Sequence, residues 1–375
     1  MRDAVIVEAV RTPVGKRNGG LAGVHPADLS AHVLQSLVSR AGLDPVNVDD
    51  VVWGCVSQIG EQTYDIARTA VLAAGWPESV PGTTVDRQCG SSQQAVHFAA
   101  AGLIAGHYDV VVAGGVESMS RVPMGSSAAG QDPMGERFRA RYGVAPDQGT
   151  GAEMIAAQWG FSRTQLDEFA LSSHERAAAA QDDGQFTGQI TPVGSVAADE
   201  GIRRGGSVEA LARLKPAFRP DGVITAGNAS QISDGSAALL MTTSDKAREL
   251  GLTPIARVHS VALAGADPVI MLTAPIPATQ KVLARSGLRL DEIGVFEINE
   301  AFASVPLAWL AETGADEKAL NPLGGAIALG HPLGGSGARI MTTLVHHMRA
   351  AGIRYGLQSM CEGGGQANAT ILELL

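Results

Sequence analysis

Cys89 stands in the stretch VDRQCGSS (85–92), between a β-branched run and a long alanine-rich segment that is predicted to be helical. A thiol is nucleophilic as its thiolate, and its pKa in water is about 8.5. The opening of a helix offers unpaired N–H donors and the positive end of the helix dipole, and both favour the anion. Cys89 is therefore predicted to be a nucleophile on a strand-to-helix turn. A small buried hydrophobe is the alternative interpretation.

His331 lies in the glycine-rich stretch GGAIALGHPLGGSGAR (324–339), just before a segment that is predicted to be helical. Imidazole exchanges a proton near neutral pH, so His331 is predicted to be the base that takes the proton of a thiol. Glycine loops before helices also bind phosphate, which is the alternative interpretation. The stretch lacks the Lys-Ser or Lys-Thr ending of a P-loop, and this disfavours a phosphate site.

Two further stretches carry groups that could serve a reaction at Cys89. Cys361, in MCEGGGQAN (360–368), ends a predicted strand, and the glycines after it leave room for a ligand. Asn299, in EINEAFAS (297–304), follows another predicted strand, where its amide could fix a water or a carbonyl oxygen, or cap a helix. Zinc is an alternative for two cysteines and a histidine, but C-x-x-C and H-E-x-x-H spacings do not occur, so no metal is predicted.

The elements that must position these groups alternate between strand and helix. Residues 1–118 are predicted to form an N-terminal core half, completed by a strand near 236–244, and residues 250–375 a C-terminal core half. Residues 119–233 differ in composition, with loop-like stretches rich in Gly, Ser, Met and Arg followed by helical segments, one of which has Ser162 as its predicted N-cap. They are predicted to form an inserted subdomain.

An internal repeat links the two halves. GLDPVNVDDVVWGCV (42–56) has a partner in GLRLDEIGVFEIN (287–299), and AAGLIAGHYDVVVAGG (100–115) has one in AAGIRYGLQSMCEGGG (350–365). Each half thus combines an alanine-rich helix, a short turn, a strand and a glycine cluster. This order predicts duplicated βαβ halves that share one layered α/β core, although any two βα units look partly alike.

The bulk composition disfavours several classes of protein. The 375 residues are 45% hydrophobic and carry a formal net charge of −10, so we expect a large core and no binding of nucleic acid. The opening MRDAVIVEAVRTP is charged too early for a secretion signal, and no run approaches the roughly 18 apolar residues of a membrane span. Three cysteines without close pairing, including Cys55 as a predicted buried hydrophobe, favour a cytoplasmic protein.

Together these stretches resemble the thiolase family, the 3-ketoacyl-CoA thiolases and acetyl-CoA acetyltransferases. The motifs follow the family's order along nearly the whole chain: VEAVRTPVGK, QCGSS, GGVESMS, LKPAF, TAGNAS, NEAFAS, GGAIALGHPLGGSGAR and CEGGG. The resemblance implies a five-layered αβαβα fold with two similar halves and a loop subdomain. It also implies an acyltransferase of fatty-acid β-oxidation that acts on acyl-CoA, takes coenzyme A as co-substrate, holds no bound cofactor, and forms a homodimer or homotetramer.

The resemblance also implies a role for each candidate residue. Cys89 would be the acylated nucleophile of a ping-pong mechanism, with His331 as the base that activates it. Cys361 would be the second acid/base, which moves a proton on the acetyl carbon or the CoA thiol. Asn299 would hold a water that forms one oxyanion hole with the histidine. The backbone N–H groups of Cys89 and Gly363 would form the other.

The same resemblance implies a path for the CoA phosphates and pantetheine, where a guanidinium suits phosphate. The residues along it are Arg203, Ala226, Ser230, Ile232 and Phe302. The neighbouring Arg204, Arg213 and Arg219 are predicted to be solvent-exposed surface residues that do not contact CoA.

Departures from the family pattern leave the acyl group open. Short-chain members usually carry His-Met where Asp147 and Gln148 stand, Ser92 replaces a glycine near the nucleophile, and Glu362 stands where a small or apolar residue is usual. GKRNGGLAGVHPADL and NASQISDGSAA are closer to degradative thiolases. Acetoacetyl, long-chain and steroid side-chain groups are all compatible with this pattern.

Three other functions fit the sequence less well than a thiolase does. A 3-ketoacyl synthase shares the fold but carries two histidines beside its cysteine, whereas this chain has Cys361 in a C-x-G-G context. A papain-like hydrolase has its glutamine several residues before the cysteine, whereas Gln88 is adjacent to Cys89. A non-catalytic CoA or lipid binder would not need all four catalytic positions filled.

Overall fold

A ten-stranded mixed sheet organises residues 2–375, which the computed structural model describes. Its strand order is β4-β3-β5-β6-β1-β7-β10-β9-β8, and β2 pairs with β6 beside this path. The strands are β1 (Val5–Arg11), β2 (Gly15–Lys16), β3 (Asp50–Gly54), β4 (Thr83–Val85), β5 (Val110–Ser118), β6 (Ser233–Thr242), β7 (Ala256–Gly265), β8 (Val295–Ile298), β9 (Tyr355–Glu362) and β10 (Gln366–Leu374).

The strand order confirms the repeat that the sequence predicts. From its edge inward, one half of the sheet runs β3-β5-β6-β1, and the other half runs β8-β9-β10-β7. The β3–β5 and β8–β9 pairs are parallel, whereas each remaining pair in these two series is antiparallel. The halves join through β1 and β7, where Val5 pairs with Arg257 and Ile6 pairs with Ala256. The sheet is therefore two related halves joined by a short seam.

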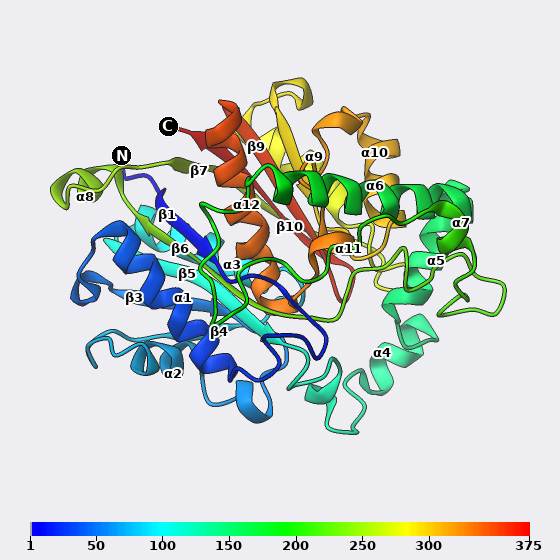
Figure 1. Cartoon of the computed structure of the whole chain (residues 1–375), viewed down its shortest axis with the longest axis horizontal. Helices are drawn as coiled ribbons and strands as arrows, with labels where there is room; N and C mark the ends of the chain where they lie inside the picture. The colour runs from blue at the N-terminus through cyan, green and yellow to red at the C-terminus, as the bar shows by residue number, and fades with distance from the viewer. Residues whose placement is uncertain (1) are drawn as a thin grey trace.

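Helices cover both halves and fill the space between them (Figure 1). Helices α1 and α2 pack on the first half, α9 packs on the second, and α3 and α12 pack against each other and against strands. This gives the five αβαβα layers expected from the resemblance. The bounds are α1 (Pro26–Ala41), α2 (Ile66–Ala73), α3 (Ser91–Ala105), α8 (Ser244–Glu249), α9 (Pro275–Ser286), α10 (Ser304–Thr313), α11 (Ala326–Leu329) and α12 (Ser336–Ala351).

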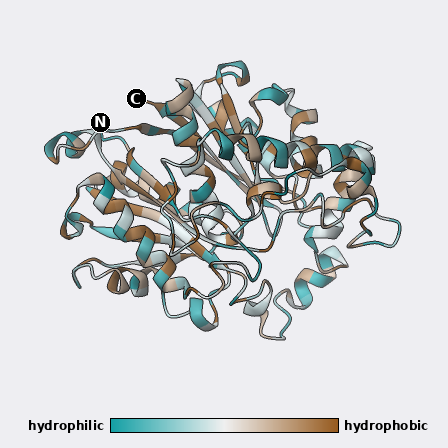
Figure 2. Ribbon diagram, viewed as in Figure 1, coloured by the Kyte–Doolittle hydropathy of each residue, from teal (hydrophilic) through white to brown (hydrophobic). Residues whose placement is uncertain are grey.

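The two central helices are buried on most sides, which explains their composition. Helix α3 buries Ala95, Ala99 and Ala100, small residues that allow close packing. All of the first ten residues of α12 are buried as well. Hydrophobic residues accordingly follow the strands and the inner helix faces, whereas hydrophilic residues mark the outer surface (Figure 2).

Four helices lie between β5 and β6: α4 (Gly135–Tyr142), α5 (Gln148–Trp159), α6 (Arg163–Asp182) and α7 (Val208–Ala212). Ser162 caps α6 as predicted, in a capping box with Gln165. Helix α5 packs on α10, and α6 packs on α11. The strand expected near 236–244 is β6, which begins at Ser233. The division of the chain at residues 118, 233 and 250 stays a prediction.

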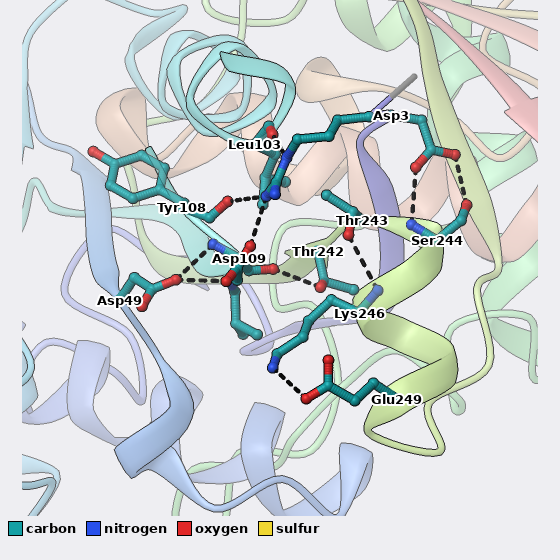
Figure 3. Close-up of polar contacts among 12 residues, drawn as sticks. Asp3, Asp49, Leu103, Tyr108, Asp109, Thr242, Thr243, Ser244, Lys246 and Glu249 are labelled. Atoms are coloured by element: carbon teal, nitrogen blue, oxygen red, sulfur yellow. Dashed lines mark hydrogen bonds and ion pairs between the residues drawn. The ribbon is translucent and has the colours of Figure 1, made fainter. Parts of the chain in front are cut away.

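Polar contacts close the end of the sheet where β5 begins and β6 ends (Figure 3). The Asp49 carboxylate accepts from the backbone N–H of Asp109, and the Thr242 hydroxyl donates to the Asp109 carbonyl at 2.6 Å. At the neighbouring turn, the Asp3 carboxylate accepts from the N–H of Ser244 at 2.8 Å. The opposite ends of β5 and β6 carry Glu117 and Ser233, which lie at the candidate site. Within residues 2–375, no helix combines the length and the apolarity that crossing a membrane requires.

Candidate active site

Cys89 lies in a tight turn between β4 and α3. The preceding residue, Gln88, has a φ of 48°, in the left-handed region that non-glycine residues rarely adopt. The hydroxyl of Ser91 donates to the carbonyl of Gln88 at 2.6 Å, and the Asn368 amide of β10 donates to the carbonyl of Gly90 at 2.9 Å. Contacts from both halves of the sheet therefore hold the turn, which places Cys89 just before the N-terminus of α3.

The Cys89 thiol is 3% exposed, and burial raises its pKa. A negative charge on Cys361 or Glu362, when either is ionised, would raise the pKa of Cys89 further, while the side chain of Gln148 opposes the rise. The structure thus differs from the expectation that the helix dipole favours a thiolate, because the cost of desolvating the anion outweighs the favourable dipole. Cys89 is protonated at rest and needs a base at the moment of attack.

His331 lies between α11 and α12, where its ring position is set by Ser336. The Ser336 hydroxyl donates to the carbonyl of Pro332 at 2.8 Å, so it must accept from Nδ1–H of His331, which lies 2.6 Å away. The lone pair is then on Nε2. Burial, followed by the charge of Arg339, lowers the pKa of His331 to about 3. His331 is therefore a neutral imidazole whose Nε2 is unprotonated.

Asn299 joins the imidazole to the second thiol. Its Nδ2 lies 3.5 Å from Nε2 of His331 and 3.7 Å from Sγ of Cys361. Helix α10 begins only at Ser304, so Asn299 is not a helix cap. Burial raises the pKa of Cys361 to about 11, with the Asn299 amide opposing. Cys361 is therefore a thiol that can donate a proton near neutral pH.

The turn between β9 and β10 brings Cys361 and Gly363 to the nucleophile. A Cβ added to Gly363 would lie 2.9 Å from Oε1 of Gln88, so this turn lies directly against the Cys89 turn. The structure therefore gathers the five candidate catalytic residues at one place, although they come from both halves of the sheet.

Glu117, at the end of β5, was not singled out in the sequence. Its buried carboxylate accepts from the backbone N–H groups of Val56 at 3.0 Å, Ser57 at 3.1 Å and Gly334 at 2.9 Å. These bonds tie the segment after β3 to the loop that carries His331. An acidic residue at the end of an otherwise apolar strand, as in GGVESMS, is the signal that could have identified it.

Ser92, a departure from the family pattern, also links the two halves. Its side chain is fully buried, and its hydroxyl oxygen accepts from the N–H of Ala338 at 2.8 Å. Because Ala338 lies in the first turn of α12, this bond fixes the start of α3 against the start of α12. The loops that carry Cys89 and His331 precede these two helices.

A cavity of about 650 Å³ contains four of the five predicted CoA contacts: Arg203, Ala226, Ser230 and Ile232. Lys16 and Arg17 also line it and were not predicted. The cavity thus carries three cationic side chains against the single carboxylate of Glu200, although the chain is acidic overall. Arg204 forms an ion pair with Asp182 at the surface, which agrees with its prediction as a solvent-exposed residue.

Phe302 does not line this cavity, but it lies next to the segment that contains Ser230. It pairs through its backbone with Ala229, and its ring meets that of Phe218 edge-on at 5.8 Å. Phe302 also belongs to the buried cluster that contains Cys361. It therefore connects the segment around Ser230 with the second thiol.

A second cavity, of about 400 Å³, opens on Cys89 itself. Leu333 and Gln148 line it together with the thiol. Leu333 and Cys89 belong to one buried cluster, and Ile232 of the first cavity packs against that cluster. Cys89 thus lines one cavity, and its buried cluster borders the other through Ile232.

Cys55, the third cysteine, does not belong to this site. Cys55 is fully buried in the core around α1, which confirms its interpretation as a hydrophobe. Across residues 2–375, His, Cys, Asp and Glu side chains form no group of three that could hold a metal ion.

Glu362 is a fully buried carboxyl behind the two thiols. Neither of its oxygens has a hydrogen-bond partner among the described residues, and a Cβ at Gly90 would overlap Oε1. Burial raises its pKa to about 8, which the charge of Arg87 opposes and that of Asp86 increases. Glycine at position 90 is thus required by the carboxyl of Glu362.

The raised pKa makes the stability of the protein depend on pH through Glu362. The ordinary pKa of a glutamate is 4.5 and the folded value is about 8, so its ionisation destabilises the fold progressively as pH rises between these values. We expect Glu362→Gln to be more stable relative to wild type at pH 8 than at pH 5 by at least about 1 kcal/mol, since one pKa unit is about 1.4 kcal/mol. Urea unfolding at both pH values measures this difference.

The exposed Glu78→Gln is the matched control, for which the difference from wild type should not change with pH. A Glu362→Gln difference that stays constant between pH 5 and 8 would show that the carboxyl is already ionised at pH 5.

Comparisons with known proteins agree on one family. Residues 4–245 match the family model described as thiolase, N-terminal domain, and residues 252–374 match the thiolase C-terminal domain. The chain is 49% identical to the steroid 3-ketoacyl-CoA thiolase FadA6 of Mycobacterium tuberculosis, over 100% of this chain and 95% of that protein. It is 45% identical to the 3-ketoacyl-CoA thiolase of Pseudoalteromonas translucida, over 100% and 99%.

A solved structure extends the similarity to the fold. The acetyl-CoA acetyltransferase of Bacillus anthracis superimposes with a TM-score of 0.92 at 40% sequence identity. The match covers 100% of this chain and 99% of that one.

Proposed function

The chain belongs to the thiolase family, and from this premise we propose that it is an acyltransferase that cleaves 3-ketoacyl-CoA with CoA through an acyl-cysteine. The observation that carries the assignment of residues is the contact of Asn299 with both His331 and Cys361. Carbon–carbon cleavage needs a nucleophile for the ketone and a proton for the carbon that leaves. The two thiols supply these two functions.

In the first half-reaction, Cys89 attacks the ketone carbon while Nε2 of His331 takes the thiol proton. The tetrahedral intermediate collapses, the bond between the α- and β-carbons breaks, and its electron pair stays with the acetyl-CoA fragment as an enolate. Cys361 then gives its proton to that carbon and becomes a thiolate. This role is supported by its raised pKa, which keeps the proton available until the enolate forms.

In the second half-reaction, the Cys361 thiolate takes the proton of an incoming CoA thiol. The CoA thiolate attacks the acyl-cysteine, and acyl-CoA leaves as the proton held by His331 returns to Cys89. The groups that are neutral at rest are neutral again at the end. Burial disfavours isolated charges, so the imidazolium of His331 and the thiolate of Cys361 in the acyl-enzyme stabilise each other until the second half-reaction returns both groups to neutral.

Each carbonyl oxygen needs hydrogen-bond donors when it becomes an oxyanion. We assign one oxyanion hole to a water held by Asn299 and His331, and the other to the backbone N–H groups of Cys89 and Gly363. The first is supported by the buried Oδ1 of Asn299, which lacks a protein partner within residues 2–375 and can hold such a water. One such donor is typically worth about 3 kcal/mol of transition-state stabilisation.

The CoA phosphates and pantetheine are assigned to the cavity of Arg203, Ser230 and Ile232. The cationic side chains of Lys16 and Arg17 support this assignment, because phosphate groups need compensating positive charge. A cytoplasmic homodimer or homotetramer remains the proposed form of the protein. The three cysteines are free, which supports a reducing compartment.

The proposal is tested by mixing purified protein with acetoacetyl-CoA and CoA and following the loss of the enolate absorbance. We expect CoA-dependent loss and two equivalents of acetyl-CoA for each acetoacetyl-CoA consumed. A panel of longer and bulkier 3-ketoacyl-CoA substrates should give acetyl-CoA plus the shortened acyl-CoA. Condensation that requires a malonyl thioester would instead identify a 3-ketoacyl synthase.

A further inference from the structure

The cavity at Cys89 has a mixed lining. Val56, Met124 and Leu333 contribute apolar walls, and the polar side chains are those of Ser57, Gln58, Asp86, Gln88, Ser127 and Gln148. A hydrocarbon gains from burial only against other apolar atoms, so a plain alkyl chain would contact the apolar part of this lining favourably and leave the polar part unpaired. The mixed lining therefore suits an acyl group that carries both apolar and polar atoms better than a plain fatty acyl chain.

The position of the cavity indicates which part of the substrate enters it. The cationic cavity reaches the Cys89 cluster through Ile232, and the cavity at Cys89 reaches it through Leu333. If CoA occupies the cationic cavity, the second cavity, which Cys89 itself lines, is available to the carbon chain beyond the ketone. The cavity at Cys89 is then the site of the acyl group that is transferred.

Several of its polar atoms are available to a ligand. Gln58 uses Nε2 to donate to the carbonyl of Cys55 at 3.1 Å, which leaves its Oε1 as an acceptor. The Ser127 hydroxyl has no protein hydrogen bond in the part of the chain that the structure describes. Covering such groups with an alkyl chain would remove their water without replacement, at about 1–3 kcal/mol for each group that becomes buried.

The charge of the lining further restricts the ligand. Asp86 is the ionisable carboxyl among the lining side chains, and its Oδ1 accepts from the N–H of Gln88 at 2.7 Å. The lining contains no lysine or arginine. A carboxylated acyl group would meet the charge of Asp86 without a cation to compensate it, whereas a hydroxyl could donate to Asp86 and a ketone could accept from an amide.

We propose that the transferred acyl group is neutral and oxygenated, with a hydroxyl or a ketone beyond the 3-keto group. The inference deepens the proposed function and rests on it. The sequence left the length and bulk of the acyl group open, whereas this inference specifies the polarity and charge of that group.

Three substrates of equal chain length test the inference: a plain straight-chain 3-ketoacyl-CoA, its counterpart with a hydroxyl or ketone near the end of the chain, and its counterpart with a terminal carboxylate. We expect kcat/KM for CoA-dependent thiolysis to be about 10-fold or more higher for the neutral oxygenated substrate than for the plain one, since one unsatisfied polar group costs about that factor. The carboxylate should be the poorest of the three.

Variants of the residues that line the cavity test whether these residues cause the preference for the oxygenated substrate. Gln58→Leu combined with Ser127→Ala should reduce the ratio of kcat/KM between the oxygenated and the plain substrate by about 10-fold. Gln131→Leu, an exposed residue of the same segment outside the lining, is the matched control and should keep the wild-type ratio. CoA is kept at a saturating concentration in every assay, so that differences in CoA binding do not affect the ratio of kcat/KM.

The outcomes separate this inference from the function on which it rests. No thiolysis of any of the three substrates would overturn the proposed function. Thiolysis in which the plain or the carboxylated substrate is the best, or in which the lining variant keeps the wild-type ratio, would overturn only the proposed acyl chemistry.

Discussion

Replacement of Cys89 by serine is expected to abolish the acyl-enzyme and to lower kcat by about 10⁴-fold or more, the range found when a catalytic nucleophile is removed. A buried thiol with a raised pKa can still be deprotonated by His331 during attack, because a sulfur anion is far more stable than an alkoxide. A serine hydroxyl at the same place would have to form that alkoxide in a desolvated site. Intact-protein mass spectrometry after mixing with acetoacetyl-CoA measures the acetylated species directly.

Cys55→Ala is the control, because this thiol is free and buried in the core around α1. It should become acetylated as the wild type does. Acetylation of Cys89→Ser at the wild-type level, with the label on another residue, would remove Cys89 from the mechanism.

Replacement of Cys361 by alanine is expected to separate carbon–carbon chemistry from thioester exchange. Without the second thiol, the enolate has no proton donor, so thiolysis of acetoacetyl-CoA should fall by about 10³-fold, within the range typical of a lost general acid. Transfer of an acetyl group between acetyl-CoA and Cys89 forms no carbanion, and His331 can carry the proton between the Cys89 and CoA thiols in place of Cys361, so this reaction should fall much less. Exchange of labelled CoA into acetyl-CoA measures this second reaction in the same preparation.

A conservative variant distinguishes proton transfer from packing, since Cys361 is also part of a buried cluster. Cys361→Ser keeps the size of the side chain but donates its proton less readily. It should therefore resemble Cys361→Ala in thiolysis while unfolding at the wild-type urea concentration. Wild-type thiolysis by Cys361→Ala would mean that the enolate is protonated by another group.

The two predictions concern residues that local pattern could identify. Cys89, His331 and Cys361 each occupy a glycine-rich turn next to a predicted strand or helix, and such turns leave a side chain accessible to a ligand. The duplicated halves were also visible, because the order of helix, turn, strand and glycine cluster recurs. Glu117 and Ser336 were missed because their function lies in a hydrogen bond to a distant loop or ring. Lys16 and Arg17 were missed because charge in a loop does not reveal which cavity it borders.

By itself, the sequence determined the reactive groups, the elements around them, the repeat and the family. Those properties depend on residue type and on spacing over short stretches, which the chain carries in linear form. Only the tertiary structure decided that both thiols are protonated at rest, that Nε2 of His331 is the unprotonated nitrogen, and that polar side chains line part of the cavity at Cys89. Proton affinity and pocket chemistry depend on how much water is removed and on which atoms replace it. Those atoms come from segments hundreds of residues apart, so the folded arrangement has to bring them together before either property exists.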